Sequence, residues 1–373
     1  MPFRAKIFVW IAERFFGTEG NGDLKYISSL YNNSEQWETR RDTICLGIQK
    51  NALLYPWPKK TSLNATFHSY RERNEYTVEN VYFTCFPGFY VCCNVYKSVF
   101  ALPGGSPIVL CPHGHSKLGR FEGYTQTLAA TFARMGAIAV TYDMVGRGEN
   151  NQTSHNISYA LTLQLLDSVR VLDLMTSLPG VNPNKIACTG ESGGGTQTIM
   201  LTAVDERVKV AVPVVMVSSG FSGGCHCEDG LPIHHGYDYS TNNAEIAALN
   251  APKPLLLISD GHDWTMVNPY REYPFIQRIY RFYGAENNVS NVHFTWGVHD
   301  YNADKRQEAY KFIAHHLGLD IKRLQNADGL VDETGVTIED KATMLAFNSA
   351  HPRPSDSIYG AENLMIQLRT FQC

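Results

Sequence analysis

Long hydrophobic runs are missing from this chain. None of its segments approaches the ~18–20 consecutive apolar residues that a membrane-spanning helix needs, and the apolar patch Ile7–Ile11 ends before Glu13. A signal-peptide core needs about 7–15 apolar residues, so Arg4–Ile11 favours an amphipathic helix that docks on the body. Localisation stays open: periplasmic or secreted if Met1 replaces a removed signal peptide, and otherwise cytoplasmic.

The chain also lacks an excess of charge of either sign. Its 32 basic and 36 acidic residues leave a net charge of −4, and 44% of its 373 residues are hydrophobic. Partners such as nucleic acid or an anionic membrane call for a concentrated positive charge, so neither is expected. The composition is typical of a globular protein with a sizeable core. The oligomeric state does not follow from it.

Paired cysteine motifs are scarce. The nine cysteines are an odd number, so at least one thiol is free or paired between chains. Cys225 and Cys227 could form a strained disulfide, half of a metal site or two loop thiols; without a second C-x-C or C-x-x-C pair, zinc is not favoured there. His113 and His115 could also be half of a metal site, but no H-x-H-x-D-H pattern follows. We therefore expect no metal and no cofactor.

Short apolar segments alternate with amphipathic ones along most of the chain. Two strands are expected at 78–85 and 90–96, joined by a hairpin at Phe86–Phe89. Further strands are expected at 108–111, 137–142, 185–189, 208–217, 254–258 and 292–296, and helices at 124–135, 158–178, 195–201, 269–283 and 306–317. Such alternation predicts an α/β fold with a mostly parallel sheet covered by helices on both faces.

The same patterns divide the chain into three parts. Residues 1–75 are polar and helix-prone, and we expect them to form an N-terminal helical extension packed on the core. Residues 76–320 form the expected catalytic domain, with a loop-rich insertion at about 218–243. Residues 321–373 are a C-terminal appendage of loops and short elements.

Gly190–Gly194 is the most informative segment of the sequence. It has the form G-x-S-x-G, it follows the apolar segment Lys185–Thr189, and a helix-prone segment begins at Gly195. On a strand-to-helix turn this motif is a nucleophile elbow, in which glycines avoid Cβ clashes and the serine is held above the sheet edge. We therefore predict Ser192 as a nucleophile in an α/β-hydrolase fold.

A second G-x-S-x-G lies at Gly220–Gly224. It also follows a strand-like segment, but the residues after it, Cys225–Pro232, cannot start a regular helix. The structural context of an elbow is therefore missing. We interpret Ser222 as a loop serine.

A serine hydroxyl needs a base and an acid to become a nucleophile. In this fold the two follow the serine in the order acid, then histidine, each after a strand. His299 follows the last expected strand and precedes a helix, so we predict it as the general base. Asp263 follows the strand before that and is the preferred acid; Asp260, nearer the strand end, and Glu228, in the insertion, remain alternatives.

The developing oxyanion needs backbone N–H donors. One is expected from Gly193, directly after the nucleophile, and the other from His115 in the loop after the strand at 108–111. Arg147, after the strand at 137–142, could bind an acidic group of the substrate, although such an arginine often braces a loop.

Further candidates for substrate binding are spread over the same sheet edge. They are Glu191 within the elbow, His226 in the insertion, and Trp264 beside the predicted acid. The insertion interleaves polar and aromatic residues, which suits a sugar subsite but is equally typical of a surface loop.

Taken together, the sequence resembles the bacterial acetyl-xylan-esterase-like branch of the α/β-hydrolases, which includes polysaccharide-utilisation esterases and a group of pectin methylesterases. The resemblance covers about residues 40–320. It implies hydrolysis, without a metal, of sugar O-acetyl or uronic-acid methyl esters on plant cell-wall polysaccharides, and it suggests export. The motifs that carry it are His113–Ser116, Tyr142–Asp143, Gly146–Gly148, Gly190–Gly195, Asp263–Thr265, His299–Tyr301 and Lys305–Arg306.

Two other classes of function remain open. A peptidase of the prolyl-oligopeptidase type or a thioesterase would share the triad, although no propeller-like repeats precede the catalytic part. A non-catalytic binding protein on the same fold usually loses a triad member, and here Ser192, Asp263 and His299 fill all three positions.

Overall fold

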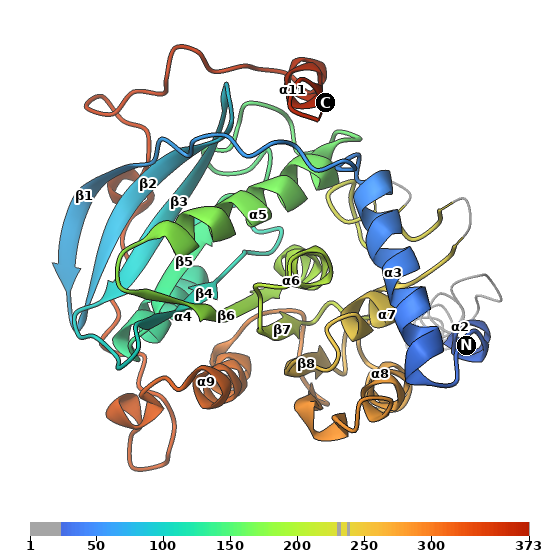
Figure 1. Ribbon diagram of the computed structural model, residues 1–373. Helices are drawn as coiled ribbons and strands as arrows, with labels where there is room; N and C mark the ends of the chain where they lie inside the picture. Colours follow the sequence, from blue (N-terminus) through green and yellow to red (C-terminus); the bar gives the residue numbers. More distant parts are fainter. Residues whose placement is uncertain (1–23, 230–232, 237–238, 373) are drawn as a thin grey trace, which may run out of the picture.

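A computed structural model describes residues 24–229, 233–236 and 239–372. The amphipathic helix expected at Arg4–Ile11 lies outside the described residues. Within them, one nine-stranded sheet runs through the molecule in the order β1-β2-β3-β5-β4-β6-β7-β8-β9 (Figure 1). The strands are β1 Thr66–Arg73, β2 Tyr76–Phe86, β3 Phe89–Ser98, β4 Ser106–Leu110, β5 Ile138–Tyr142, β6 Val181–Glu191, β7 Val210–Val214, β8 Leu255–Asp260 and β9 Val289–Phe294.

Helices connect and cover these strands. The α-helices are α2 Leu24–Ser29, α3 Ser34–Asn51, α4 Gly123–Arg134, α5 Ala160–Ser177, α6 Gly193–Val204, α7 Asn243–Ala248, α8 Glu272–Arg281, α9 Ala303–Leu317, α10 Lys341–Met344 and α11 Ala361–Arg369. Three short 3-10 helices lie at Gly119–Phe121, Glu286–Asn288 and Ile321–Leu324. No helix in the described ranges is both long and apolar enough to cross a bilayer.

The sheet is mostly parallel, as the sequence predicts. β4 to β9 pair in parallel, whereas β1, β2 and β3 pair antiparallel and β3 joins β5 antiparallel. The hairpin expected at Phe86–Phe89 is confirmed, since β2 ends and β3 begins there. Because the parallel strands share one direction, the loops after their carboxyl ends meet at a single edge of the sheet.

Two hydrophobic cores lie on opposite faces of the sheet. Successive strand residues point to opposite faces, so Ile108 and Leu110 of β4 join one core while Val109 joins the other. Helices α3, α5, α6, α7 and α8 pack on the first face, and α4 and α9 on the second (Figure 1). This is the two-sided cover that an α/β-hydrolase fold requires.

Helix α3 packs on the body of the fold through buried side chains and an ion pair. Trp37 and Ile44 are fully buried in the first core. Arg40 forms an ion pair of 2.7 Å with Glu245 at the start of α7, and the Glu245 side chain is fully buried. Residues 34–51 therefore pack on the body as expected of the N-terminal extension.

Residues 66–73 form the edge strand β1, whereas their polar composition predicts that they belong to the helical extension. Its composition is polar, with Arg71, Glu72 and Arg73 at one end, so the sequence shows no apolar alternation to indicate a strand. Pairing with β2 decides its conformation. A charged edge strand is one way in which proteins discourage pairing with another sheet.

Candidate functional site

The predicted elbow is present between β6 and α6. Ser192 has φ 53° and ψ −120°, a conformation that strains a residue with a Cβ. Its neighbours leave no room: a Cβ added to Gly190 or to Gly194 would lie 2.3 Å from the carbonyl oxygen of Pro112. The glycines of the motif are thus required by close contact with the loop after β4.

The second G-x-S-x-G lacks this geometry. Ser222 lies in the loop after β7, and residues 221–229 contain bends and turns but no helix. Gly223 packs against Glu228, where an added Cβ would lie 2.3 Å from that side chain. Ser222 is a loop serine, as the sequence predicts.

His299 and Asp263 meet at the carboxyl edge of the sheet. His299 Nδ1 lies 2.9 Å from Asp263 Oδ2, and the Asp263 side chain is only 3% exposed. The other oxygen, Oδ1, accepts hydrogen bonds from the Thr265 backbone N–H (2.7 Å) and hydroxyl (2.5 Å). Thr265 thereby fixes the carboxylate so that Oδ2 faces the imidazole, the arrangement that orients a catalytic histidine.

Asp260, the first alternative acid, is paired elsewhere. Its Oδ2 lies 2.5 Å from Lys305 Nζ, and both side chains are fully buried. Lys305 also donates to the carbonyl oxygens of Val298 (2.5 Å) and Asp300 (2.9 Å). The buried Lys305–Asp260 ion pair therefore holds the backbone on either side of His299 without contacting a ring nitrogen of His299.

Glu228, the second alternative acid, is also occupied. Its carboxylate accepts hydrogen bonds from the Thr196 hydroxyl (2.9 Å) and the Gly224 N–H (2.6 Å). Burial raises the pKa of Glu228. These contacts join the insertion to α6. It is Asp263, and not Glu228, whose carboxylate contacts His299.

The loop after β4 packs directly on the elbow. A Cβ added to Gly193 would lie 2.5 Å from Cε1 of His115, so the two residues touch. In the described part of the chain, the backbone N–H groups of His115 and Gly193 have no hydrogen-bond acceptor. Gly193 is also the first residue of α6, where unpaired N–H groups and the helix dipole favour negative charge.

The half-buried Tyr124 and the buried Glu191 hold this loop in place. Tyr124 donates a hydrogen bond to Glu191 Oε1 (2.8 Å) and accepts one from the Gly114 N–H (3.3 Å). A Cβ at Gly114 would lie 2.0 Å from Glu191 Oε1. Glu191, a candidate for substrate binding, is thus 8% exposed beneath the loop, and burial raises its pKa. Tyr124 comes from α4, far from any motif, so nothing in the sequence indicated it.

His113 joins the loops after β4 and β5. Its Nδ1–H donates to the Gly114 carbonyl (2.7 Å), and its Nε2 accepts the Met144 N–H (3.1 Å). Burial, helped by the positive charges of Arg120 and Arg147, lowers the pKa of His113 to about 4. The ring is therefore neutral at physiological pH, as these two hydrogen bonds require.

The other candidates for substrate binding lie at the same edge. The Trp264 ring packs 4.3 Å from the His299 ring and 4.4 Å from that of Phe221, measured between centroids. Arg147 is half-buried, and its Nε has no hydrogen-bond partner among the described residues. His226 is exposed on the insertion.

Among the described residues, two groups of side chains have ligand types that could hold a metal. Cys92, Asp143 and Glu149 form one, but the fully buried guanidinium of Arg120 already pairs with both carboxylates. The other group joins cysteines of the insertion to two histidines: His115, His155, Cys225 and Cys227. The C-x-C and H-x-H motifs each supply part of it.

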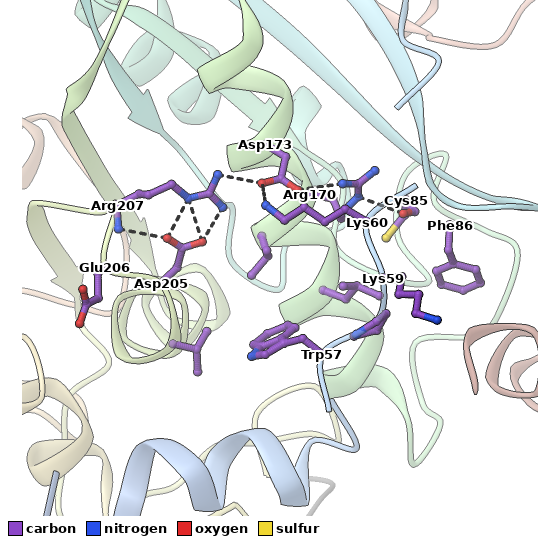
Figure 2. A pocket seen from close by; sticks show the side chains of 14 residues that line it. Trp57, Lys59, Lys60, Cys85, Phe86, Arg170, Asp173, Asp205, Glu206 and Arg207 are labelled. Carbon is purple, nitrogen blue, oxygen red and sulfur yellow. Dashed lines mark hydrogen bonds and ion pairs between the residues drawn. The ribbon is translucent and has the colours of Figure 1, made fainter. Parts of the chain in front are cut away.

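A cavity of about 340 Å³ lies away from the elbow (Figure 2). Its lining includes none of the three triad candidates. Three of its cations share one carboxylate, since Asp173 forms ion pairs with Lys60 (2.8 Å), Arg170 (2.8 Å) and Arg207 (2.7 Å). The three triad candidates therefore lie outside this cavity.

A family model and solved structures both match the chain. Residues 158–230, which include the elbow, match the family model described as acetyl xylan esterase (AXE1). Among solved structures, methylesterase BT1017 is 34% identical with a TM-score of 0.84, over 95% of this chain and 81% of that one. No curated protein matches the chain.

Two more distant structures share the fold. A glucuronoyl esterase from Teredinibacter turnerae is 11% identical with a TM-score of 0.58, covering 76% of this chain and 86% of that one. One from Solibacter usitatus is 12% identical with a TM-score of 0.55, covering 76% and 94%. At such identities the likeness concerns the fold alone, which is the α/β-hydrolase architecture described above.

Proposed function

We propose that the substrate is a methyl-esterified uronic acid of plant cell-wall polysaccharide, because the chain belongs to the family of α/β-hydrolase carbohydrate esterases that includes methylesterase BT1017. The observation that carries the proposal is 34% identity over 95% of the chain to a protein that is itself named a methylesterase. The chain is a carboxylic ester hydrolase; the proposal concerns which ester it cleaves and which residues cleave it.

We assign the chemistry to a Ser192–His299–Asp263 triad. Ser192 Oγ attacks the ester carbonyl carbon while His299 Nε2 accepts the hydroxyl proton. Asp263 holds the proton on Nδ1 and stabilises the imidazolium that forms. The negative charge of the tetrahedral intermediate lies against the N–H groups of Gly193 and His115.

Collapse of this intermediate releases the alcohol. For a methyl ester, the C–O bond to the methoxy group breaks and His299 returns its proton, so methanol leaves and the uronyl group stays on Ser192. Water, deprotonated by His299, then attacks the acyl-enzyme carbonyl. The uronate and the free Ser192 hydroxyl are the products.

A methyl ester places particular demands on the site. The sugar is on the acyl side and remains covalently bound to Ser192, so nearby loops must grip it. Trp264 and Phe221 offer adjoining aromatic faces beside His299, and aromatic faces suit sugar rings. Arg147 supplies a half-buried guanidinium at the same sheet edge, and a guanidinium suits the carboxylate of a neighbouring uronate.

Product analysis tests the proposal. The protein is incubated with methyl-esterified pectin and with acetylated xylan, and released methanol and acetate are quantified. We expect methanol from pectin at a rate well above acetate from xylan. Acetate alone would contradict the proposal and establish a sugar O-acetyl esterase, the second candidate, which the match of residues 158–230 to the acetyl xylan esterase model favours.

Replacing Arg147 tests the grip on a charged substrate. Arg147→Met keeps most of the aliphatic stem but removes the cation, so we expect KM for partly de-esterified pectin to rise about tenfold, the loss of one charged contact. Activity on p-nitrophenyl acetate, which carries no carboxylate, should change little. Lys117→Met, at an exposed lysine two residues after His115, is the matched control. Equal losses on both substrates would mean that Arg147 only braces the loop.

A further inference from the structure

Four side chains from three separate segments converge beside the elbow. His115 comes from the loop after β4, His155 from the segment between β5 and α5, and Cys225 and Cys227 from the insertion after β7. Their ligand atoms all lie within 4.8 Å of one another. We infer that these four side chains bind one zinc ion in a tetrahedral Cys2His2 site.

The distances fit such a site with a small expansion. His115 Nε2 lies 3.1 Å from Cys225 Sγ and 3.0 Å from Cys227 Sγ, and His155 Nε2 lies 3.4 Å from Cys225 Sγ. With zinc bonds of about 2.3 Å to sulfur and 2.0–2.1 Å to nitrogen, ligand atoms at tetrahedral corners are roughly 3.3–3.8 Å apart. The nitrogen–sulfur distances are within several tenths of an ångström of that range. The two sulfur atoms, 2.7 Å apart, must separate by about 1 Å.

The hydrogen bond at Nδ1 of His155 already suits a metal ligand. His155 Nδ1 donates a hydrogen bond to the Val145 carbonyl oxygen at 2.6 Å, and its Nε2 faces the cysteines. A ligating histidine commonly donates its second N–H to a backbone carbonyl, which fixes the tautomer and the orientation of the ring. The His155 ring is thus held with its free nitrogen toward the proposed ion.

A disulfide between the two cysteines explains the cluster less well. The sulfur atoms are 2.7 Å apart, whereas a disulfide bond is about 2.05 Å long. The thiols are also the partners of His115 Nε2 and His155 Nε2. A disulfide would leave both half-buried imidazoles facing weak sulfur acceptors, and an unpaired polar group costs free energy when it is buried. A zinc ion bound by two thiolates and two imidazoles satisfies all four groups.

The coordination sphere indicates a structural role. Four protein ligands close a tetrahedral zinc site, whereas a catalytic zinc keeps a position open for water. The ion would tie the insertion and the segment after β5 to His115, whose ring packs on Gly193. Metal binding does not depend on the proposed function. An effect of the metal on turnover would depend on it, because His115 is a proposed oxyanion donor in the esterase mechanism.

The metal content of the full chain tests the inference. The protein, purified without a histidine tag and without chelators, is exchanged into metal-free buffer and measured by inductively coupled plasma mass spectrometry. We expect one zinc per chain, which a strong chelator removes and added zinc restores. After replacement of zinc by Co²⁺, thiolate-to-metal charge-transfer bands and tetrahedral d–d bands should appear.

Variants locate the site. Cys225→Ser/Cys227→Ser and His155→Ala are expected to lose the metal, whereas Cys45→Ser, at a half-buried thiol bonded to the Ala203 carbonyl, should keep it. Circular dichroism checks folding, and the Co²⁺ spectrum of the wild-type chain remains informative if a variant does not fold. Wild-type protein that binds no zinc while both thiols are free, or whose intact mass shows a Cys225–Cys227 disulfide, would overturn the inference.

Discussion

Ser192→Ala is expected to lower kcat for ester hydrolysis by at least about 10⁴-fold, because no other group in the assigned mechanism can form the acyl-enzyme. Folding should be unaffected, since alanine removes one oxygen from a half-buried side chain. Methanol release from esterified pectin, followed at saturating substrate, measures the effect, and circular dichroism confirms that the variant is folded.

The chain supplies its own matched control for this experiment. Ser222 stands in the second G-x-S-x-G, in a loop that is not followed by a helix. Ser222→Ala is therefore expected to keep kcat close to that of the wild type. A large loss in Ser222→Ala with activity retained in Ser192→Ala would reverse the assignment of the nucleophile.

Asp263→Asn is expected to lower kcat about 10³–10⁴-fold with little change in KM. The reason lies in the two hydrogen bonds that Asp263 Oδ1 accepts from Thr265. An asparagine must keep its oxygen toward Thr265, so its NH₂ group faces Nδ1 of His299. The imidazole then carries its proton on Nε2 and cannot accept the proton of the serine. Steady-state kinetics on the same ester measure both constants.

Glu228→Gln is the comparison for Asp263→Asn, because Glu228 is one of the two alternative acids, with Asp260, that the order of residues in the sequence does not exclude. Its carboxylate bonds Thr196 and Gly224 rather than His299. We expect this variant to keep kcat within about tenfold of the wild type, since one side-chain contact at most is weakened. If Glu228→Gln were the slower enzyme, the acid would have to be reassigned to the insertion.

Local sequence was enough to predict the elbow. Gly190 and Gly194 are required because any Cβ at these positions would clash, above all with the Pro112 carbonyl oxygen. The motif itself therefore indicates the tight turn. His299 and Asp263 followed from the order of the strands, because the carboxyl ends of parallel strands meet at one edge. The contact between these two residues is the one that the order implied.

Residues that depend on tertiary contacts could not be predicted. His115 and Cys227 are 112 positions apart, and His155 belongs to no motif, so no spacing in the sequence indicates the Cys2His2 cluster. The sequence indicates Lys305 only through the resemblance to acetyl-xylan-esterase-like proteins. Its buried contacts with Asp260 and with the backbone near His299 arise from the packing of α9. The polar strand β1 was missed because pairing with β2, rather than its own pattern, determines its conformation.

Labelling with a fluorophosphonate tests most directly whether Ser192 is the nucleophile. The reagent phosphonylates an activated serine, and the mass of the intact protein with mapping of the labelled peptide identifies the residue. We expect one adduct per folded chain, located on Ser192, which is absent from Ser192→Ala and from heat-unfolded protein. An adduct on Ser222, or no adduct on folded wild-type protein that still hydrolyses esters, would contradict this expectation.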